Sequence, residues 1–272
     1  MTGRRQGTLD VMTDPAIPAA TLPGGVRMPM VGFGTWQLRG RAGCRAIQAA
    51  LAAGYRHIDT ATMYGNEADV GQALAASGLA RDEVFITTKL PSGRAGHERA
   101  TLAASLRALG TGHVDLWLVH WPPAHRQLTD VWRELLALRD EGRVRAVGVS
   151  NYSLAQIDRI TEATGQAPAV NQIPWGPARY DAGLLAAHRE RGIAVEGYSP
   201  LKGASLASPV LAGIAEAHGV APAQVVLRWH LEHEVVTIPK SADPGRIAAN
   251  IDLLGFSLTP GEVARIDALG RS

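Results

Sequence analysis

Cysteine, net charge and long apolar runs are all scarce in this sequence of 272 residues. The single cysteine, Cys44, excludes an internal disulfide and a cysteine-based zinc site, and it is typical of a reducing compartment. The 27 basic residues exceed the 25 acidic residues by only two, and no basic run occurs. We therefore expect no nucleic-acid partner.

Membrane and export signals are also missing. No stretch reaches the about 18 consecutive apolar residues that a membrane-spanning helix requires, so we expect no membrane contact. Arg4 and Arg5 lie near the start, but the apolar run of a twin-arginine signal does not follow them. We expect a cytoplasmic protein with a disordered tail over residues 1–16 and one folded domain over residues 17–272.

Short apolar segments of β-prone residues alternate with longer segments of helical period. Residues 98–110, for example, place Leu102, Leu106 and Leu109 on one helical face, and Gly110 stands where a helix would end. Four β-prone segments end in a polar residue at regular intervals: Asp59, Lys89, His120 and Asn151 are separated by 30, 31 and 31 residues.

This interval is about the length of one strand with its returning helix. With residues 30–34 as the first strand, eight such units fit the chain, which predicts a (β/α)8 TIM barrel. Residues 20–29 predict a β-hairpin that covers the N-terminal mouth of the barrel, and residues 257–269 predict an extra C-terminal helix. The alternative, a doubly wound open sheet, would carry a G-x-G-x-x-G loop, of which only Gly32 to Gly34 is present.

Active sites of such barrels lie where the C-terminal ends of the strands converge. The polar residues at the ends of the predicted strands should therefore share one site. They are Asp59, Lys89, His120, Asn151, Gln172, Tyr198 and Lys240, with Tyr64 five residues beyond Asp59. Only three lysines occur in the chain, and two of them stand at strand ends.

These residue types favour proton donation to a carbonyl group. A buried Lys89 needs an anionic partner, which Asp59 on the neighbouring strand can provide. We expect the ammonium to lower the pKa of Tyr64, which would make the phenol a proton donor, with His120 orienting the substrate oxygen. No metal-ligand set and no nucleophile accompany them, so the hydride would come from a nicotinamide cofactor.

Successive segments resemble the signatures of the aldo-keto reductase family, in the manner of its NADPH-dependent, 2,5-diketo-gluconate reductase-like members. The segments are GYRHIDTATMYGNEADVG, FITTKL, VDLWLVHWP, GVSNYS, YSPL and IPKSADPGRIAAN, in order between about Gly32 and Leu269. The resemblance implies a catalytic tetrad of Asp59, Tyr64, Lys89 and His120, with Tyr64 as proton donor to aldehydes, ketones or dicarbonyls. It also implies NADPH bound without a Rossmann fold.

The resemblance assigns cofactor and substrate contacts residue by residue. Thr35, Ser150, Asn151, Gln172 and Tyr198 would surround the nicotinamide, and Ser199 and Leu201 the pyrophosphate. The adenosine end would be held by Lys240, Ser241, Arg246 and Asn250. Trp36 and Trp121 would wall the substrate pocket, whereas Trp117, Trp132 and Trp229 are expected in the core, and for Trp175 both placements remain open.

Some positions depart from the family pattern. Pro91 stands where an aromatic residue is common, Ala249 replaces a glutamate near the adenine, and residues 173–177 differ from the usual sequence. The loop after Trp121 is short and the chain ends at Ser272 without a long substrate loop, so we expect an open mouth and a broad, modest reductase.

The sequence is compatible with three hypotheses about function. The first is an NADPH-dependent reductase, expected to be monomeric. The second is a non-catalytic or regulatory barrel that binds the cofactor, since a fold alone does not imply catalysis. The third is a lyase or isomerase that uses Lys89 to form a Schiff base.

Overall fold

The computed structural model describes residues 17–124, 127–202 and 204–271. The tail predicted over residues 1–16 lies outside the described residues. Eight parallel strands form one sheet in the order β10-β9-β8-β7-β6-β5-β4-β3. These strands are β3 (Phe33–Gly34), β4 (His57–Asp59), β5 (Phe85–Leu90), β6 (Val114–Val119), β7 (Val144–Ser150), β8 (Val170–Pro174), β9 (Ala194–Tyr198) and β10 (Val236–Thr237).

A parallel bridge between Val31 and Thr237 joins the two edges of this sheet. Backbone hydrogen bonds reinforce it: the amide of Gly32 donates to the carbonyl of Thr237 at 2.8 Å, and the amide of Thr237 donates to the carbonyl of Met30 at 2.9 Å. The sheet therefore curls into the predicted (β/α)8 barrel, and the open-sheet alternative is excluded.

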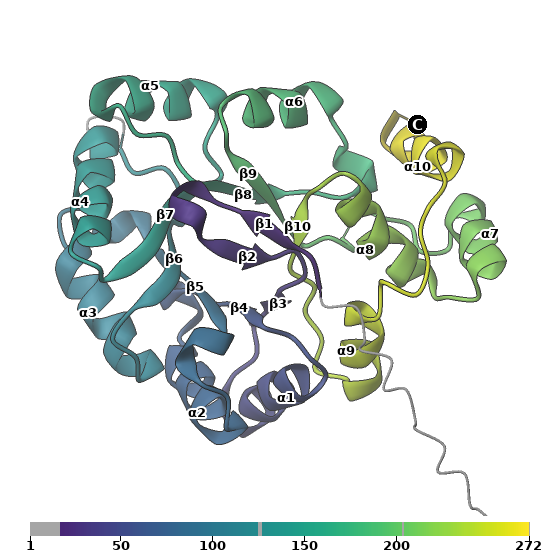
Figure 1. The fold of residues 1–272 in the computed structure, drawn as a ribbon, viewed down its shortest axis with the longest axis horizontal. Helices are drawn as coiled ribbons and strands as arrows, with labels where there is room; N and C mark the ends of the chain where they lie inside the picture. Colours follow the sequence, from purple (N-terminus) through teal and green to yellow (C-terminus); the bar gives the residue numbers. More distant parts are fainter. Residues whose placement is uncertain (1–16, 125–126, 203, 272) are drawn as a thin grey trace, which may run out of the picture.

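Helices surround the strands (Figure 1). They are α1 (Gly40–Ala52), α2 (Glu67–Ser77), α3 (Glu98–Leu109), α4 (Leu128–Asp140), α5 (Leu154–Thr164), α6 (Ala182–Glu190), α7 (Pro209–His218), α8 (Pro222–Glu232), α9 (Pro244–Ile251) and α10 (Pro260–Asp267). Two of them, α7 and α8, lie between β9 and β10 in the chain. Several helices end at the predicted glycines, such as Gly110 and Gly165, whose φ angles of 68° and 70° are left-handed.

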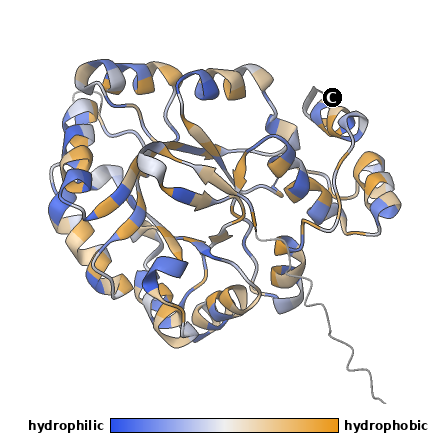
Figure 2. Ribbon diagram, in the orientation of Figure 1, coloured by the Kyte–Doolittle hydropathy of each residue, from blue (hydrophilic) through white to orange (hydrophobic). Residues whose placement is uncertain are grey.

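The amphipathic pattern of the helices sets the layers of the molecule. Apolar and polar residues alternate around the helical ring in Figure 2, and the apolar faces pack against the outer side of the strands. Trp117, Trp132 and Trp229 are buried in the core as predicted, and so is Trp175. The placement of Trp175, left open by the sequence, is therefore settled.

The predicted N-terminal hairpin consists of β1 (Ala19–Thr21) and β2 (Arg27–Pro29), paired antiparallel. Its turn passes through two glycines with φ near 77°, a conformation that other residues rarely adopt. Leu22 and Met28 of the hairpin are buried in one cluster with Leu116 and Val170, which lie near the starts of their strands. The hairpin thus closes the N-terminal mouth and lies across the barrel centre in Figure 1.

The predicted extra C-terminal helix is α10. Thr259 caps it, since its hydroxyl accepts from the amide of Glu262 while the Glu262 carboxylate accepts from the amide of Thr259. The indole of Trp229 in α8 donates to Asp267 at 2.7 Å, which attaches α10 to the outer ring. With the hairpin at the N-terminal mouth, the mouth at the C-terminal ends of the strands is left uncovered.

Candidate active site

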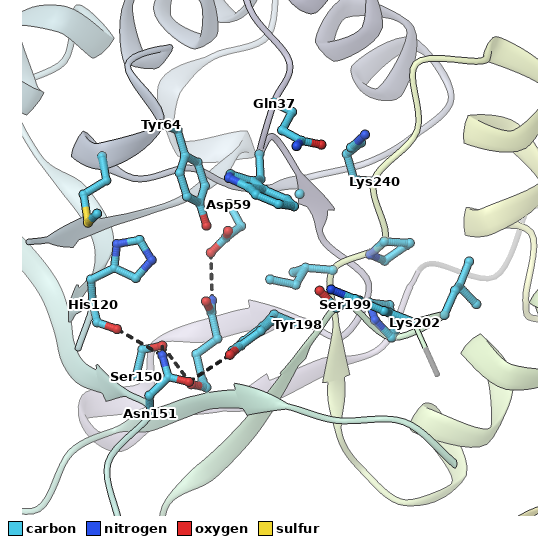
Figure 3. Close-up of a pocket in the computed structure, with 18 of the residues that line it drawn as sticks. Gln37, Asp59, Tyr64, His120, Ser150, Asn151, Tyr198, Ser199, Lys202 and Lys240 are labelled. Atoms are coloured by element: carbon cyan, nitrogen blue, oxygen red, sulfur yellow. Dashed lines mark hydrogen bonds between the residues drawn. The ribbon is translucent and has the colours of Figure 1, made fainter. Parts of the chain in front are cut away.

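A cavity of about 560 Å³ lies at the C-terminal ends of the strands (Figure 3). Most of the residues predicted for the site line it. They are Trp36, Asp59, Tyr64, His120, Trp121, Ser150, Asn151, Gln172, Tyr198, Ser199, Leu201 and Lys240. The strand ends therefore converge as the spacing of the sequence predicted.

Beneath the cavity, Asp59 and Lys89 form a buried ion pair. The Lys89 Nζ donates to Asp59 Oδ1 at 2.6 Å, to Asp59 Oδ2 at 2.7 Å and to the carbonyl of Thr60 at 2.9 Å. Burial alone would lower the pKa of Lys89, but Asp59 opposes it, and the pKa is raised overall. A charged amine that donates to three acceptors is a poor nucleophile. This geometry therefore disfavours the hypothesis of a lyase or isomerase that forms a Schiff base on Lys89.

Tyr64 lies over this pair, at the end of the short helix η2 (Thr62–Tyr64). Its ring centroid is 5.1 Å from the Lys89 Nζ. The hydroxyl of Thr62 donates to the carbonyl of Lys89 at 2.9 Å, and Arg39 Nε donates to the carbonyl of Tyr64 at 2.9 Å. These bonds hold the loop on both sides and fix the phenol above the ammonium.

The expected lowering of the Tyr64 pKa is wrong in its net direction. Burial raises the pKa of the phenol, and this effect outweighs the lowering by the Lys89 ammonium, while Asp59 raises it further. Burial depth cannot be inferred from the neighbouring residues in the chain, which explains the error. The phenol therefore keeps its proton at neutral pH, and its donation depends on the negative charge that develops on the substrate oxygen.

His120, just beyond the end of β6, faces Tyr64, and the two rings meet edge to face with centroids 5.7 Å apart. Burial and the nearby Lys89 lower the pKa of His120 to about 4, so the imidazole is neutral at pH 7. Its Nδ1 is buried and has no hydrogen-bond partner among the described residues. A neutral imidazole beside the phenol can orient a carbonyl oxygen without adding charge.

The floor of the cavity is formed by the amides of Asn151 and Gln172, the hydroxyl of Ser150 and the ring of Tyr198. Asn151 donates from Nδ2 to the carbonyl of His120 at 3.1 Å and to Ser150 Oγ at 2.9 Å, and its Oδ1 accepts from the Tyr198 hydroxyl at 2.9 Å. Figure 3 shows these groups gathered below Tyr64 and Asp59. Such amides and a half-buried ring suit a flat carboxamide-bearing ring such as nicotinamide.

Backbone strain is concentrated around this cavity. Among the described residues, four that are not glycine have a left-handed φ, and three of them line the cavity: Gln37 (65°), Asn151 (62°) and Ser199 (53°). Residues in this conformation cost free energy and persist where the surroundings hold them. Their clustering marks the mouth as a functional surface.

Five predicted site residues do not line the cavity. Thr35 and Lys89 are fully buried and act on it through Asp59: the Thr35 hydroxyl donates to the carbonyl of Asp59 at 2.9 Å. The other three follow β10: Ser241 lies in the loop before α9, and Arg246 and Asn250 lie within α9. Arg246 is 78% exposed, and Lys240 is exposed at the edge of the cavity.

The lining also includes residues that the sequence did not assign to the site, notably Gln37, Met63 and Lys202. In Figure 3, Lys202 and Lys240 lie at the opposite side of the view from His120. A long cavity with a proton donor near one end and cations near the other fits a phosphate-bearing dinucleotide. Glu196 was also missed, although it stands two residues before Tyr198 and so faces the same side of β9.

Other kinds of site are not evident in the part of the chain that the structure describes. It contains no group of three or more histidine, cysteine, aspartate or glutamate side chains placed to hold a metal ion. Over the same residues, no single helix is long and apolar enough to cross a membrane; only α7 and α8 taken together, bent by 88°, reach that length and composition.

The fold and the site define a class, a (β/α)8 barrel oxidoreductase with a tyrosine, a histidine and a buried lysine–aspartate pair at its mouth. The chain belongs to the aldo/keto reductase family, whose model matches residues 30–271. It is 45% identical over 257 residues to an aldo-keto reductase of Mycolicibacterium smegmatis, covering 93% of each chain. It is 42% identical to 2,5-diketo-D-gluconic acid reductase B of Corynebacterium sp., covering 94% of this chain and 95% of that one.

Comparison with solved structures supports the same family assignment. An aldo/keto reductase from Brucella melitensis superposes with a TM-score of 0.90 at 41% identity, covering 93% of this chain and all of the other. An aldo-keto reductase from Bombyx mori, solved in complex with NADP, superposes with a TM-score of 0.86 at 33% identity, covering 93% and 92%. The protein is therefore an NADP-dependent oxidoreductase of this family.

Proposed function

We propose that the protein reduces small aldehydes, ketones and dicarbonyls to alcohols, with Tyr64 as the proton donor. The observation that carries the proposal is the buried Asp59–Lys89 pair beneath a protonated Tyr64. A nicotinamide cofactor, held by the residues named below, would supply the hydride when bound. Tyr64 and His120 receive the substrate oxygen, and the phenolic proton moves to that oxygen as its negative charge develops.

The remaining site residues support this chemistry. Asn151, Ser150 and Gln172 would hold the carboxamide, and Tyr198 would stack on the nicotinamide ring. The pyrophosphate would pass Ser199 and Leu201 toward the adenosine end. The apolar faces of Trp36 and Trp121 border the mouth and would keep water from the substrate.

The alternative of a non-catalytic cofactor-binding barrel receives less support. A binding barrel requires neither a proton donor nor a buried ammonium beneath it, and burying such an ion pair is costly. All four groups of the tetrad are present and adjacent in the structure. We also propose that the protein is cytoplasmic, because a single cysteine is typical of a reducing compartment, and that it acts as a monomer.

Replacement of the proton donor tests the proposed function. Tyr64→Phe should lower kcat for carbonyl reduction by about 10²–10⁴-fold, the usual contribution of a general acid. NADPH affinity, measured by fluorescence titration, should change little, because the phenol acts only as charge develops in the transition state.

Tyr55→Phe is the matched control. Tyr55 is buried away from the cavity, and its hydroxyl donates to the carbonyl of Ile247 at 3.3 Å. This variant should keep its turnover. Near-normal turnover in Tyr64→Phe would refute the proposed mechanism.

A further inference from the structure

A second carboxyl group lies beneath the cavity and takes no part in the mechanism above. Glu196 of β9 is fully buried inside the barrel. One amide nitrogen, Gln172 Nε2, donates to Glu196 Oε2 and to Asp59 Oδ2, both at 2.8 Å. Glu196 Oε1 has no hydrogen-bond partner among the described residues. Two carboxyl groups therefore share a single bridging amide.

We call the space beneath the cavity, which holds Asp59, Lys89, Gln172 and Glu196, the buried chamber. It contains fewer positive charges than two carboxylates would need. The Lys89 ammonium uses its three hydrogen bonds on Asp59 and on the carbonyl of Thr60. His57 Nε2 is 3.6 Å from Glu196 Oε1, beyond hydrogen-bond distance, and lies 3.1 Å from the hydroxyl of Thr87.

The other groups around Glu196 add no positive charge. Burial lowers the pKa of His57 to about 4, so this imidazole is neutral at pH 7. Tyr64, on η2, is a neutral phenol. On the adjoining strands, β8 contributes only the uncharged amide of Gln172, and β10 places Val236 opposite Glu196. One ammonium thus faces two carboxyl groups, and only one of them can be an anion without leaving an unpaired buried charge.

We propose that Glu196 is a positioning residue that keeps a proton on its carboxyl group while carbonyl reduction proceeds, and that loss of this proton sets the alkaline limit of the reaction. The kinetic part of this inference rests on the proposed function, whereas the protonation part does not. As a neutral group, Glu196 leaves the Asp59–Lys89 pair without net charge. As an anion, it would oppose the negative charge that develops on the substrate oxygen above.

The pKa of Glu196 is raised, as expected for a second carboxyl group buried beside Asp59. Burial, and next the charge of Asp59, raise the pKa of Glu196 to about 8, while the hydrogen bond from Gln172 and the charge of Lys89 lower it less. Ionised Glu196 in turn raises the pKa of Tyr64. The phenol would then release its proton less readily.

The test is the pH dependence of reduction in Glu196→Gln, which keeps the carbonyl acceptor for Gln172 and cannot ionise. The kcat of the wild type should decline as pH rises through about 8, whereas the kcat of the variant should stay level across that range. Glu141→Gln is the control, because Glu141 is a surface carboxylate that pairs with Arg99. This control should decline as the wild type does.

A second readout needs no activity. A carboxyl group whose pKa is raised in the folded state stabilises the fold fully below its unfolded value of about 4.5, and this stabilisation is lost as pH rises to about 8. In denaturant unfolding, the wild type should therefore lose stability relative to Glu196→Gln over that range. If Glu196→Gln does not fold, infrared spectra of ¹³C-glutamate-labelled wild type and Glu67→Gln provide the same answer, as a protonated carboxyl band that disappears near pH 8 in both proteins. Burial also raises the pKa of Glu67, and the Glu67→Gln spectrum removes its contribution.

Each outcome decides the inference. A protonated glutamate at pH 7 together with a shifted alkaline limit supports it. Absence of that protonated carboxyl, or an alkaline limit that is the same in Glu196→Gln and in the wild type, overturns it. Failure of the proposed function is seen separately, as turnover in Tyr64→Phe, and leaves the infrared and unfolding results standing.

Discussion

At the scale of single residues, the ammonium of Lys89 determines the charge of the whole buried chamber. It is fully buried, it is bonded to both oxygens of Asp59, and it lies under the ring of Tyr64. Removing one partner of a buried ion pair leaves the other charge uncompensated, which costs more than the pair itself contributes. The same side chain therefore affects both stability and proton transfer.

Lys89→Met should show both effects. The free energy of unfolding should fall by about 3–5 kcal/mol, the cost of breaking a buried pair, and carbonyl reduction should be largely lost. The double variant Asp59→Asn, Lys89→Met should recover much of the stability, because the stranded carboxylate is gone, but not the activity. Urea unfolding and steady-state kinetics on the same samples measure the two effects. Equal stability of the single and double variants would contradict this account.

At the scale of elements, the segment from β10 to α9 carries the cations predicted for the adenosine end. Lys240 follows β10, and Arg246 lies in the first turn of α9, where the Asp243 side chain accepts from its backbone amide at 2.8 Å. This cap leaves the guanidinium exposed to solvent. A 2′-phosphate is doubly charged, and arginine can bind it through two parallel hydrogen bonds.

NADPH should therefore bind more tightly than NADH, and the preference should depend on these two side chains. Lys240→Ala and Arg246→Ala should each weaken NADPH binding by about tenfold or more, the usual effect of losing a hydrogen bond to a charged group. NADH affinity should change little, since it lacks the phosphate. Fluorescence titration with both cofactors measures this, with Arg133→Ala on the exposed face of α4 as control. Similar losses for both cofactors would place the phosphate elsewhere.

The elements also explain what the sequence could and could not predict. A strand with its helix has a nearly constant length, so the intervals between Asp59, Lys89 and His120 predicted both the barrel and the convergence at its mouth. The period of two along β9 places Glu196 on the same side of the strand as Tyr198, so the sequence does contain a signal for this residue. The pKa of Tyr64 depends on how deeply other segments of the chain bury the phenol. The residues next to Tyr64 in the sequence do not determine that depth, so the direction of the shift could not be predicted from them.

At the scale of the whole molecule, one mouth of the barrel is covered and the other is open. The hairpin covers the N-terminal mouth, whereas the C-terminal mouth exposes large apolar side chains: Trp36 is 55% exposed, Met63 59% and Trp121 48%. Apolar walls make few directional demands on a substrate, and discrimination among close analogues depends mainly on polar contacts.

We therefore expect broad and modest activity. Small aldehydes and dicarbonyls should be reduced with high KM, and bulkier ketones should be accepted without a sharp size limit, because an open mouth orients substrates weakly. NADPH oxidation across a panel of carbonyl compounds, with NADH in parallel, measures this breadth. A preference of about 10⁴-fold for one carbonyl over its close analogues, the scale of a polar-matched site, would contradict it.

The seam between β3 and β10 has a consequence for the opening motions of the barrel. These two strands have only two residues each, and few backbone hydrogen bonds join them. Segments with few such bonds open locally at the lowest free energy. Trp36 and Gln37 continue from one side of the seam and Lys240 from the other, and all three line the cavity. A dinucleotide bound between them would bridge this seam, and we expect it to lower the rate at which the barrel opens there.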